Sequence, residues 1–303
     1  MGMIETQERI RRLLDDNNAI LLAHYYQRDE IQDIADILGD SLALSMEAAE
    51  TTADVIVFAG VRFMAESASI LSPDKTVLLP RPDVGCPLAD KITVEELEKA
   101  KAEHPDAKVV TYVNSSAEIK AHSDICCTSA NAVRIVSSLD TDTVLMVPDG
   151  NLARYAAQFT EKEIIPWKGF CYVHNNLLPD EVRKVKDAHP GAPVAVHPEC
   201  RPEVLAMADF VGSTGGILEF ARQTDAQEVI IGTEQGIMHQ LKKESPGKTF
   251  IPASDHLICL DMKRMTLDDI LSSLLEKKHV IQVPEEMRVP ASLALSRMLE
   301  ASR

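Results

Sequence analysis

The sequence predicts an α/β protein built from three repeated units of parallel sheet and helix around a pseudo-threefold axis. Three observations lead to this prediction: short apolar runs alternate with amphipathic stretches, one segment recurs twice further along the chain, and a cysteine follows at the same point of each copy. Short buried strands that alternate with helices form parallel sheets covered on both faces. The 303 residues suffice for two or three domains of ordinary size.

The strands are predicted from short, continuous apolar runs, which are typical of parallel sheets buried on both faces. Such runs occur at residues 19–23, 55–58, 77–79, 109–113, 144–147, 194–196, 229–231 and 250–251. Amphipathic stretches predict helices at residues 94–103, 179–188 and 266–275. Residues 263–303 are predicted to form a tail of helix, strand (279–283) and helix that packs on the core.

An internal repeat aligns three segments without gaps over about twenty residues. They read LLAHYYQRDEIQDIADILGDS from residue 21, VTYVNSSAEIKAHSDICCTS from residue 110 and VAVHPECRPEVLAMADFVGST from residue 194. The offset is 88 residues and then 85, so His24, Tyr112 and His197 are equivalent. The repeat predicts three α/β units at residues 1–88, 89–174 and 175–262.

Polar residues recur where the first strand of each copy ends and where a later helix is expected to begin. Ligands bind at the carboxyl ends of parallel strands, so the three copies are expected to face one central site. A hydroxyl residue at a helix start caps the helix and leaves N–H groups for an anion. The positions are His24, Tyr26, Tyr112, Asn114, His197 and Glu199 at strand ends, and Ser41, Ser129 and Thr214 at helix starts.

The charge of the chain excludes some classes of partner. Lys and Arg number 31 against 47 Asp and Glu, which gives a net charge of −16. Nucleic acids and anionic membranes attract basic surfaces, so neither is an expected partner. We see no apolar run long enough for a membrane helix and no signal-peptide core. The six cysteines are therefore expected to be reduced thiols of a cytoplasmic protein.

Three of the cysteines share one phase of the repeat. Cys86, Cys171 and Cys259 each follow a strand that ends in proline, and they lie 85 and 88 residues apart. A single cysteine is usually a small core residue, but three in one phase predict that the symmetry gathers their thiols. Of the others, Cys126 and Cys127 are predicted to pack in the core, while Cys200 is ambiguous, near the site but not expected as a ligand.

Three thiols without a fourth equivalent indicate a metal site with an open position. Ligation by sulfur alone favours an iron–sulfur cluster, and a 4Fe–4S cluster on three cysteines leaves one iron without a protein ligand. Such an iron can act as a Lewis acid on a substrate oxygen. Dehydration or elimination is therefore the predicted chemistry.

Eleven motifs carry a resemblance to a known family, in order, between residues 20 and 263. They are AHYYQ from residue 23, DIADILGDS from 33, FAGVRFMAE from 58, GCPLAD from 85, YVNSSAE from 112, CTSANA from 127, GFCYVH from 169, HPEC from 197, GSTGG from 212, IGTEQGIMHQL from 231 and CLDMK from 259. With these motifs the chain resembles the quinolinate synthetase A family, in its short form without a C-terminal cysteine group.

The resemblance implies three α/β units around a 4Fe–4S cluster, held by Cys86, Cys171 and Cys259. It implies condensation of iminoaspartate with dihydroxyacetone phosphate to quinolinate, phosphate and two waters, on the aspartate route to NAD. An upstream enzyme that produces iminoaspartate is then an expected partner. The implied substrate contacts are His24, Tyr26, Ser41, Tyr112, Val113, Asn114, Ser129, His174, His197, Pro198, Glu199, Ser213 and Thr214.

Glu199 is the expected general base, because proton transfers between imine, enamine and ketone forms need a base of tunable pKa. His197 is expected to bind an anion or pass protons, and Tyr26 and Tyr112 to donate O–H groups to an oxyanion. Each residue also has a purely structural interpretation: a salt-bridged or capping glutamate, a satisfied histidine, or a core aromatic.

Two other functions stay open on the residues alone. One is a reductase like the diphosphate reductase that ends the methylerythritol phosphate isoprenoid pathway, which also combines three cysteines with three α/β units but needs an electron donor. The other is a metal-binding or iron-sensing module without catalysis. Formation of quinolinate without a reductant separates the three functions.

Overall fold

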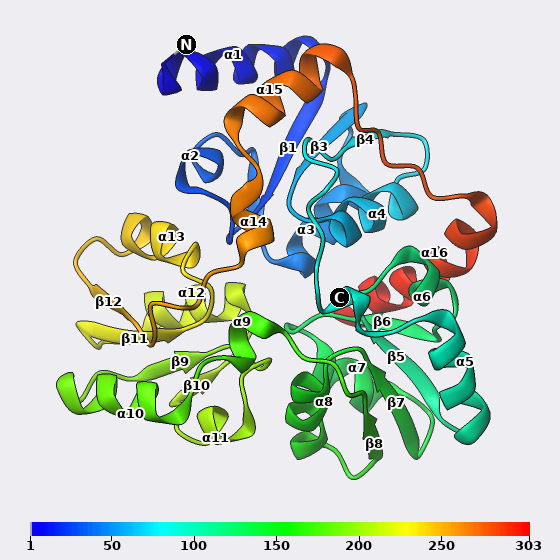
Figure 1. Ribbon diagram of the computed structural model, residues 1–303, viewed down its shortest axis with the longest axis vertical. Coiled ribbons are helices and arrows are strands. Elements are labelled where there is room, and N and C mark those ends of the chain that lie inside the picture. Colours follow the sequence, from blue (N-terminus) through cyan, green and yellow to red (C-terminus); the bar gives the residue numbers. More distant parts are fainter. Residues whose placement is uncertain (1) are drawn as a thin grey trace.

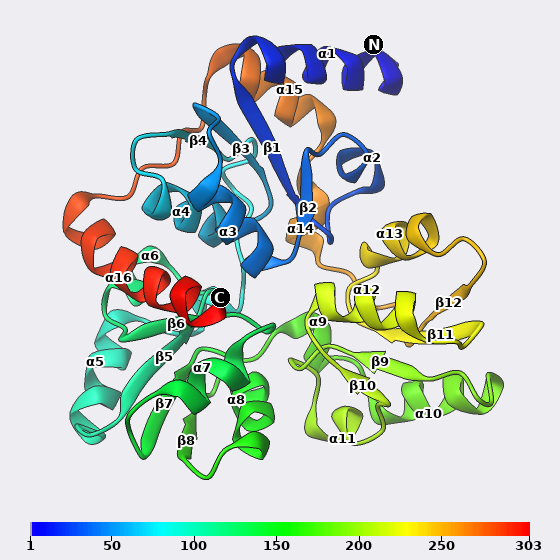
Figure 2. The same ribbon diagram turned by 180° about the vertical axis from the view of Figure 1, so that it is seen from behind.

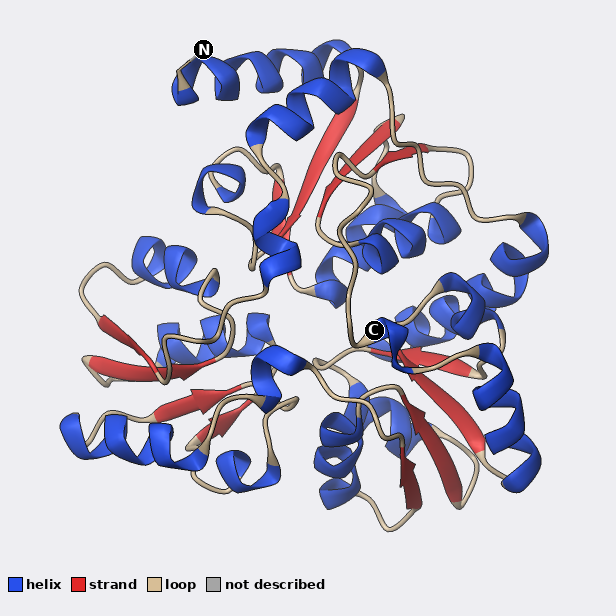
Figure 3. Ribbon diagram, viewed as in Figure 1, coloured by secondary structure: helices blue, strands red, loops and turns tan. Residues whose placement is uncertain are grey.

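The computed structural model describes residues 2–303. Three parallel sheets of four strands each, flanked by helices, surround a common centre (Figures 1 and 3). This confirms the predicted α/β class with three repeated units. Seen from behind, α3, α7 and α12, which each follow the second strand of a unit, lie around the same centre (Figure 2).

The helices and strands follow one another in the same way in each sheet. Around the first sheet lie α1 (Met3–Asp16), β1 (Ala19–His24), α2 (Asp29–Gln32), β2 (Ile37–Gly39), α3 (Ser41–Glu50), β3 (Val55–Ala59), α4 (Arg62–Leu71) and β4 (Thr76–Leu78). Around the second lie η1 (Ala89–Lys91), α5 (Val94–Glu103), β5 (Lys108–Tyr112), α6 (Ala117–Ala121), β6 (Ile125–Cys127), α7 (Ala132–Ser138), β7 (Thr143–Val147), α8 (Gly150–Ala156), η2 (Ala157–Phe159), β8 (Glu163–Pro166) and α9 (Tyr172–Asn175). Around the third lie α10 (Pro179–Ala188), β9 (Val194–Val196), α11 (Pro202–Leu205), β10 (Phe210–Val211), α12 (Thr214–Gln223), β11 (Glu228–Gly232), α13 (Ile237–Glu244) and β12 (Thr249–Pro252).

The three sheets share one strand order and one register. The orders are β2-β1-β3-β4, β6-β5-β7-β8 and β10-β9-β11-β12. The eight strands predicted by range within the three units are present, and β8 is the strand predicted to end in proline before Cys171. The short edge strands β2, β6 and β10 lie outside the predicted ranges because two or three residues carry little periodicity. Equivalent pairs of the repeat face each other: Leu22 with Ile37, Val110 with Ile125 and Ala195 with Phe210.

An aspartate at one repeat position ties the second strand of each unit to the first. Asp124 accepts the Val109 N–H at 2.8 Å and returns its own N–H to the Val109 carbonyl at 3.1 Å. Asp36 and Asp209 make the same pair of bonds in the other two sheets. This part of the repeat therefore maintains the fold rather than the site.

Replacing Asp124 by alanine is expected to destabilise the protein by about 1–3 kcal/mol, because the buried Val109 N–H loses its acceptor. The free energy of unfolding in urea, measured by circular dichroism under anaerobic conditions, checks this. The exposed Asp106 is the matched control, and Asp106→Ala should leave the stability unchanged. Equal stability of Asp124→Ala and the unaltered protein would contradict the proposed clamp.

The tail returns across the first two units. After α14 (Leu260–Arg264), α15 (Leu267–Glu276) packs beside α1, and α16 (Glu285–Ser302) packs on α6 and β6 (Figure 1). The predicted helix at 266–275 is confirmed, but the predicted strand at 279–283 is wrong. Only Val280 forms a bridge, antiparallel to Leu78. Left-handed φ angles of 46° at Lys277 and 65° at His279 turn the chain just before this bridge, so no extended strand begins at His279.

The hydrophobic cores differ between the units. Side chains of the first two units and the tail form one large core, and the second unit has a further cluster of its own around Leu97 and Val109. The third unit packs two clusters on the two faces of its sheet. Among residues 2–303, no helix combines the length and the apolar character that crossing a membrane requires. Where the three units meet, polar and apolar side chains together line a pocket.

Candidate active site

A pocket lies at the centre of the molecule, where the three units meet. About 700 Å³ of space, part of it open to solvent, lies between its lining residues. All nine strand-end and helix-start residues of the repeat line it: His24, Tyr26, Ser41, Tyr112, Asn114, Ser129, His197, Glu199 and Thr214. The triplication thus brings together residues that lie far apart in the sequence.

The three cysteines of the shared phase line the same pocket. Cys86, Cys171 and Cys259 are partly buried and form no disulfide. Burial raises the pKa of all three thiols, that of Cys86 to about 12, so ionising them calls for a bound cation. Against this rise, the backbone N–H groups three residues on, of Ala89, His174 and Met262, lower the pKa of their respective thiols. One thiol from each unit, oriented alike, is a donor set that suits an iron–sulfur cluster.

Two buried carboxylates hold the backbone of two of these cysteines. Asp149 accepts the N–H of Cys171 and Glu234 accepts the N–H of Cys259, both at 3.1 Å. Lys263 lies 3.1 Å from Glu234 and compensates its charge. Sequence reasoning missed both carboxylates, although their spacing of 85 residues is the offset of the repeat and could have revealed them.

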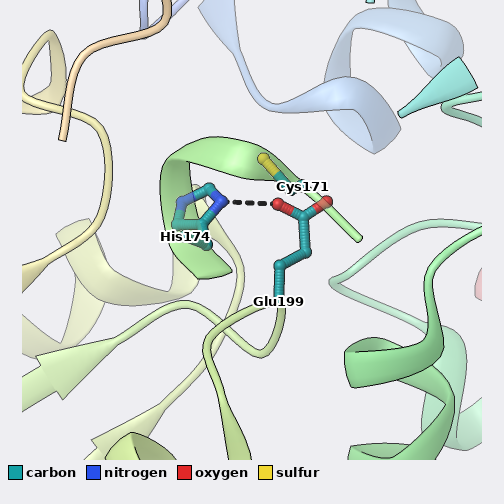
Figure 4. A group of neighbouring side chains, drawn as sticks. All are labelled: Cys171, His174 and Glu199. Carbon is teal, nitrogen blue, oxygen red and sulfur yellow. Dashed lines mark ion pairs between the residues drawn. The ribbon is translucent and has the colours of Figure 1, made fainter. Parts of the chain in front are cut away.

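Glu199 is the centre of the acid–base groups. Its Oε2 lies 2.6 Å from Nδ1 of His174 and 3.4 Å from Nδ1 of His197 (Figure 4). Burial alone would raise the pKa of Glu199, but His197 and His174 and hydrogen bonds from His174 and Tyr112 lower it to about 2. With its pKa lowered, the Glu199 carboxylate is ionised at neutral pH.

Two of the pocket histidines, His24 and His197, are neutral bases. Burial lowers the pKa of His24 to about 4 and that of His197 to about 3. The His197 ring stacks on His174, with 4.4 Å between the ring centroids, and its Nδ1 accepts the Glu199 N–H at 3.3 Å. His24 accepts the Tyr26 N–H in the same way, at 3.1 Å. These backbone bonds fix which ring edge faces the pocket.

The buried state of His197 predicts a pH dependence of stability. The folded protein keeps the ring neutral down to about pH 3, whereas the unfolded chain protonates it below its ordinary pKa of 6.5. The free energy of unfolding therefore falls as the pH is lowered between these values, by up to about 1.4 kcal/mol per pH unit from this group.

Urea unfolding between about pH 4 and about pH 7 checks this expectation. His197→Gln should flatten the dependence, while the same change at the exposed His104 should leave it unaltered. Identical slopes for the unaltered protein and His197→Gln would contradict a neutral, buried His197.

The helix starts differ in detail from the prediction. Asp40 and Ser213, not Ser41 and Thr214, are the N-cap residues of α3 and α12 and accept the first backbone N–H groups. Ser129 lies before α7 rather than at its cap. Ser41 and Thr214 therefore do not cap these helices. They lie in the first turn of each helix and line the pocket.

Some of the other predicted residues line the pocket and some do not. His174 lines it, whereas Val113, Pro198 and Ser213 are not among its lining residues. Cys126 and Cys127 are buried in the core as predicted, and Cys200 is also fully buried. Lining residues that sequence reasoning missed are Asp40, Val61, Phe63, Met64, Gly85, Pro87, Leu88, Tyr172, Val173, Glu234 and Met262. Most are apolar and carry no chemical signal of their own.

Cys171 also belongs to a mixed group of possible metal ligands. Its sulfur, a nitrogen of His174 and an oxygen of Glu199 lie within 4.8 Å of one another (Figure 4). Tetrahedral ligands at about 2.0–2.1 Å from an ion are roughly 3.3 Å apart. The 2.6 Å between His174 and Glu199 is a hydrogen-bonding distance instead. The two side chains are placed for proton transfer. A single ion bound by both would have to move them further apart.

The fold and the site define a triplicated α/β enzyme with three thiols and an acid–base group in one central pocket. The family model of the quinolinate synthetase A protein matches residues 8–300. The chain therefore belongs to the quinolinate synthetase A family.

Curated relatives agree over nearly their full lengths. The quinolinate synthase of Geotalea uraniireducens is 58% identical over 99% of this chain and 98% of its own. That of Methanoregula boonei is 56% identical over 97% of both chains. Quinolinate synthase 1 of Methanosarcina acetivorans is 56% identical over 99% of this chain and 98% of its own.

Proposed function

We propose that the protein synthesises quinolinate for NAD biosynthesis, by condensing iminoaspartate with dihydroxyacetone phosphate. The other products are phosphate and two waters, and no electrons are gained or lost overall. The observation that carries the proposal is the convergence of three thiols, one from each unit, on the pocket that also contains Glu199. Membership of the family and relatives named quinolinate synthase support it.

Cys86, Cys171 and Cys259 would hold a 4Fe–4S cluster. The partly buried thiols, their N–H donors and the two carboxylates behind them support this assignment. Bound there, the cluster supplies a Lewis acid that eases the departure of a substrate hydroxyl. Six free cysteines suit a reducing compartment, which supports a cytoplasmic location. An upstream enzyme that delivers iminoaspartate follows from the proposed substrate alone.

The surrounding residues provide for binding and proton transfer. No Lys or Arg is among the lining residues within the described range 2–303, so anionic substrate groups must be bound by hydroxyls and helix N-termini. Ser41 and Thr214 begin the ten-residue helices α3 and α12 and lie on the pocket. Glu199, ionised and buried, is the base, and Tyr26, Tyr112 and His197 orient and protonate oxygen atoms.

Anaerobically reconstituted protein, given iminoaspartate and dihydroxyacetone phosphate without a reductant, tests the proposal. Quinolinate, detected by chromatography and mass spectrometry together with one phosphate per turnover, is the expected result. An activity that needs an electron donor would indicate the reductase instead. Iron binding without any product would indicate a metal-binding module.

A further inference from the structure

Thr233 lies between two residues of the site without lining the pocket. It directly follows β11 and is only 1% exposed. Its Oγ1 is 2.6 Å from the hydroxyl of Tyr26 and 2.9 Å from Nε2 of His174. A single buried hydroxyl thus bridges the end of the first sheet and helix α9.

Three hydrogen bonds and one close ion pair join this hydroxyl and its partners in a continuous line from Thr214 to Glu199. Thr214 donates to Tyr26 at 2.7 Å, and Nδ1 of His174 lies 2.6 Å from Glu199. A hydroxyl has one proton to donate. With Tyr26 accepting from Thr214, its own proton goes to Thr233, whose proton goes to Nε2 of His174. The remaining ring proton, on Nδ1, faces the Glu199 carboxylate, so every bond points the same way.

We propose that Thr233 is a positioning residue that joins Tyr26 to the His174–Glu199 pair in one proton relay, an inference that rests on the proposed function. The Tyr26 oxygen takes a proton from the substrate while its own proton passes to Thr233. The Thr233 proton passes to Nε2 of His174, and the Nδ1 proton passes to Glu199. At each atom one bond to hydrogen forms and one breaks, and Glu199 ends with the single proton gained.

The reversed chain then returns that proton through Tyr26 to a departing hydroxyl, which leaves as water. Removal of a proton and loss of water are both required by the proposed reaction. Burial raises the pKa of Tyr26 well above its ordinary value, so a tyrosine anion is strongly disfavoured. A relay avoids that anion because Tyr26 releases one proton as it takes another.

The repeat shows that the fold itself does not require this hydroxyl. The offsets of 85 and 88 residues make Pro148 and Gly60 the equivalents of Thr233 in the other two units. Neither has a side-chain hydroxyl, yet both units keep the same strand order. The hydroxyl at position 233 is therefore specific to the part of the pocket that contains Tyr26 and His174.

The experiment compares Thr233→Val, Thr233→Ser and Thr111→Val as reconstituted holoenzymes. Valine should lower kcat by at least about tenfold, with KM, iron content and absorption spectrum unchanged, because a bridge between acid–base groups is lost. Serine should restore kcat to within about threefold. Thr111, also buried but on the strand face opposite Tyr112, is the control and should keep its kcat.

Tyr26→Phe in combination with Thr233→Val distinguishes a relay from two separate effects. Residues of one relay act together, so adding Thr233→Val to Tyr26→Phe should change kcat little. Three results would each overturn the proposal. The two substitutions could lower kcat by factors that multiply in the double variant, Thr233→Val could leave kcat unchanged, or Thr233→Val could lose iron that Thr233→Ser does not restore.

Neutron diffraction of the deuterium-exchanged holoenzyme tests the same proposal without turnover. Deuterium on Nδ1 of His174 and none on Nε2 is expected, and the opposite tautomer would overturn the relay direction. If the unaltered enzyme makes no quinolinate, the proposed function fails, and the neutron result still decides the hydrogen-bond chain. If the unaltered enzyme makes quinolinate and the Thr233→Val variant has the same kcat, only the relay fails.

Discussion

Glu199→Gln is expected to lower kcat for quinolinate formation by about 10²–10⁴-fold while the iron content stays unchanged. Glutamine keeps the size of the side chain and can still accept hydrogen bonds from His174 and Tyr112, but it cannot take up a proton. Because Glu199 does not bond to any of the three cysteines, the metal site should assemble as before.

The measurement is a steady-state assay of quinolinate with iron analysis and an absorption spectrum on the same sample. Glu203→Gln is the matched control, since Glu203 lies exposed four residues further on and should tolerate the change. Near-normal turnover in Glu199→Gln would show that another residue is the base. Loss of iron in this variant would instead assign Glu199 to the metal.

Alanine at Cys86, Cys171 or Cys259 is the second large expected effect, with loss of most bound iron and of quinolinate formation. A 4Fe–4S cluster on three thiolates has no spare protein ligand, so removing one leaves two irons unsupported. The three variants should resemble one another, because each unit contributes one equivalent thiol.

Iron and sulfide analysis with electronic spectra of anaerobically reconstituted protein checks this. Cys200→Ala is the control: Cys200 is fully buried, its Sγ lies 3.6 Å from the Gly232 carbonyl, and it is not among the lining residues. Its variant should bind about four irons per chain, like the unaltered protein. Full iron content in any of the three pocket variants would reject that cysteine as a ligand.

The repeat makes much of this architecture predictable from the sequence. Its offsets of 85 and 88 residues predict that His24, Tyr112 and His197 meet at one centre, and the pocket confirms that placement. The α/β class follows from apolar runs long enough to carry a signal. The predicted strand at 279–283 is wrong because apolar residues alone do not reveal that Lys277 and His279 turn the backbone.

The contacts that connect the units could not be predicted in the same way. Thr233 bonds to Tyr26 of the first unit and His174 of the second, and a lone buried threonine has no pattern that marks it. Asp149 and Glu234 act within their own units, and only their spacing of 85 residues marks them. The helix caps at Asp40 and Ser213 were misplaced by one residue, because neighbouring polar residues can each cap a helix. Roles assigned to single residues in the pocket stay predictions, which the variants described above measure.

Anomalous diffraction at the iron edge, from crystals grown without oxygen, tests most directly whether three units share one cluster. We expect iron density bonded to Cys86, Cys171 and Cys259, with one iron free of any protein ligand. A single ion held by Cys171, His174 and Glu199, or density that leaves one of the three sulfurs unbound, would contradict the account.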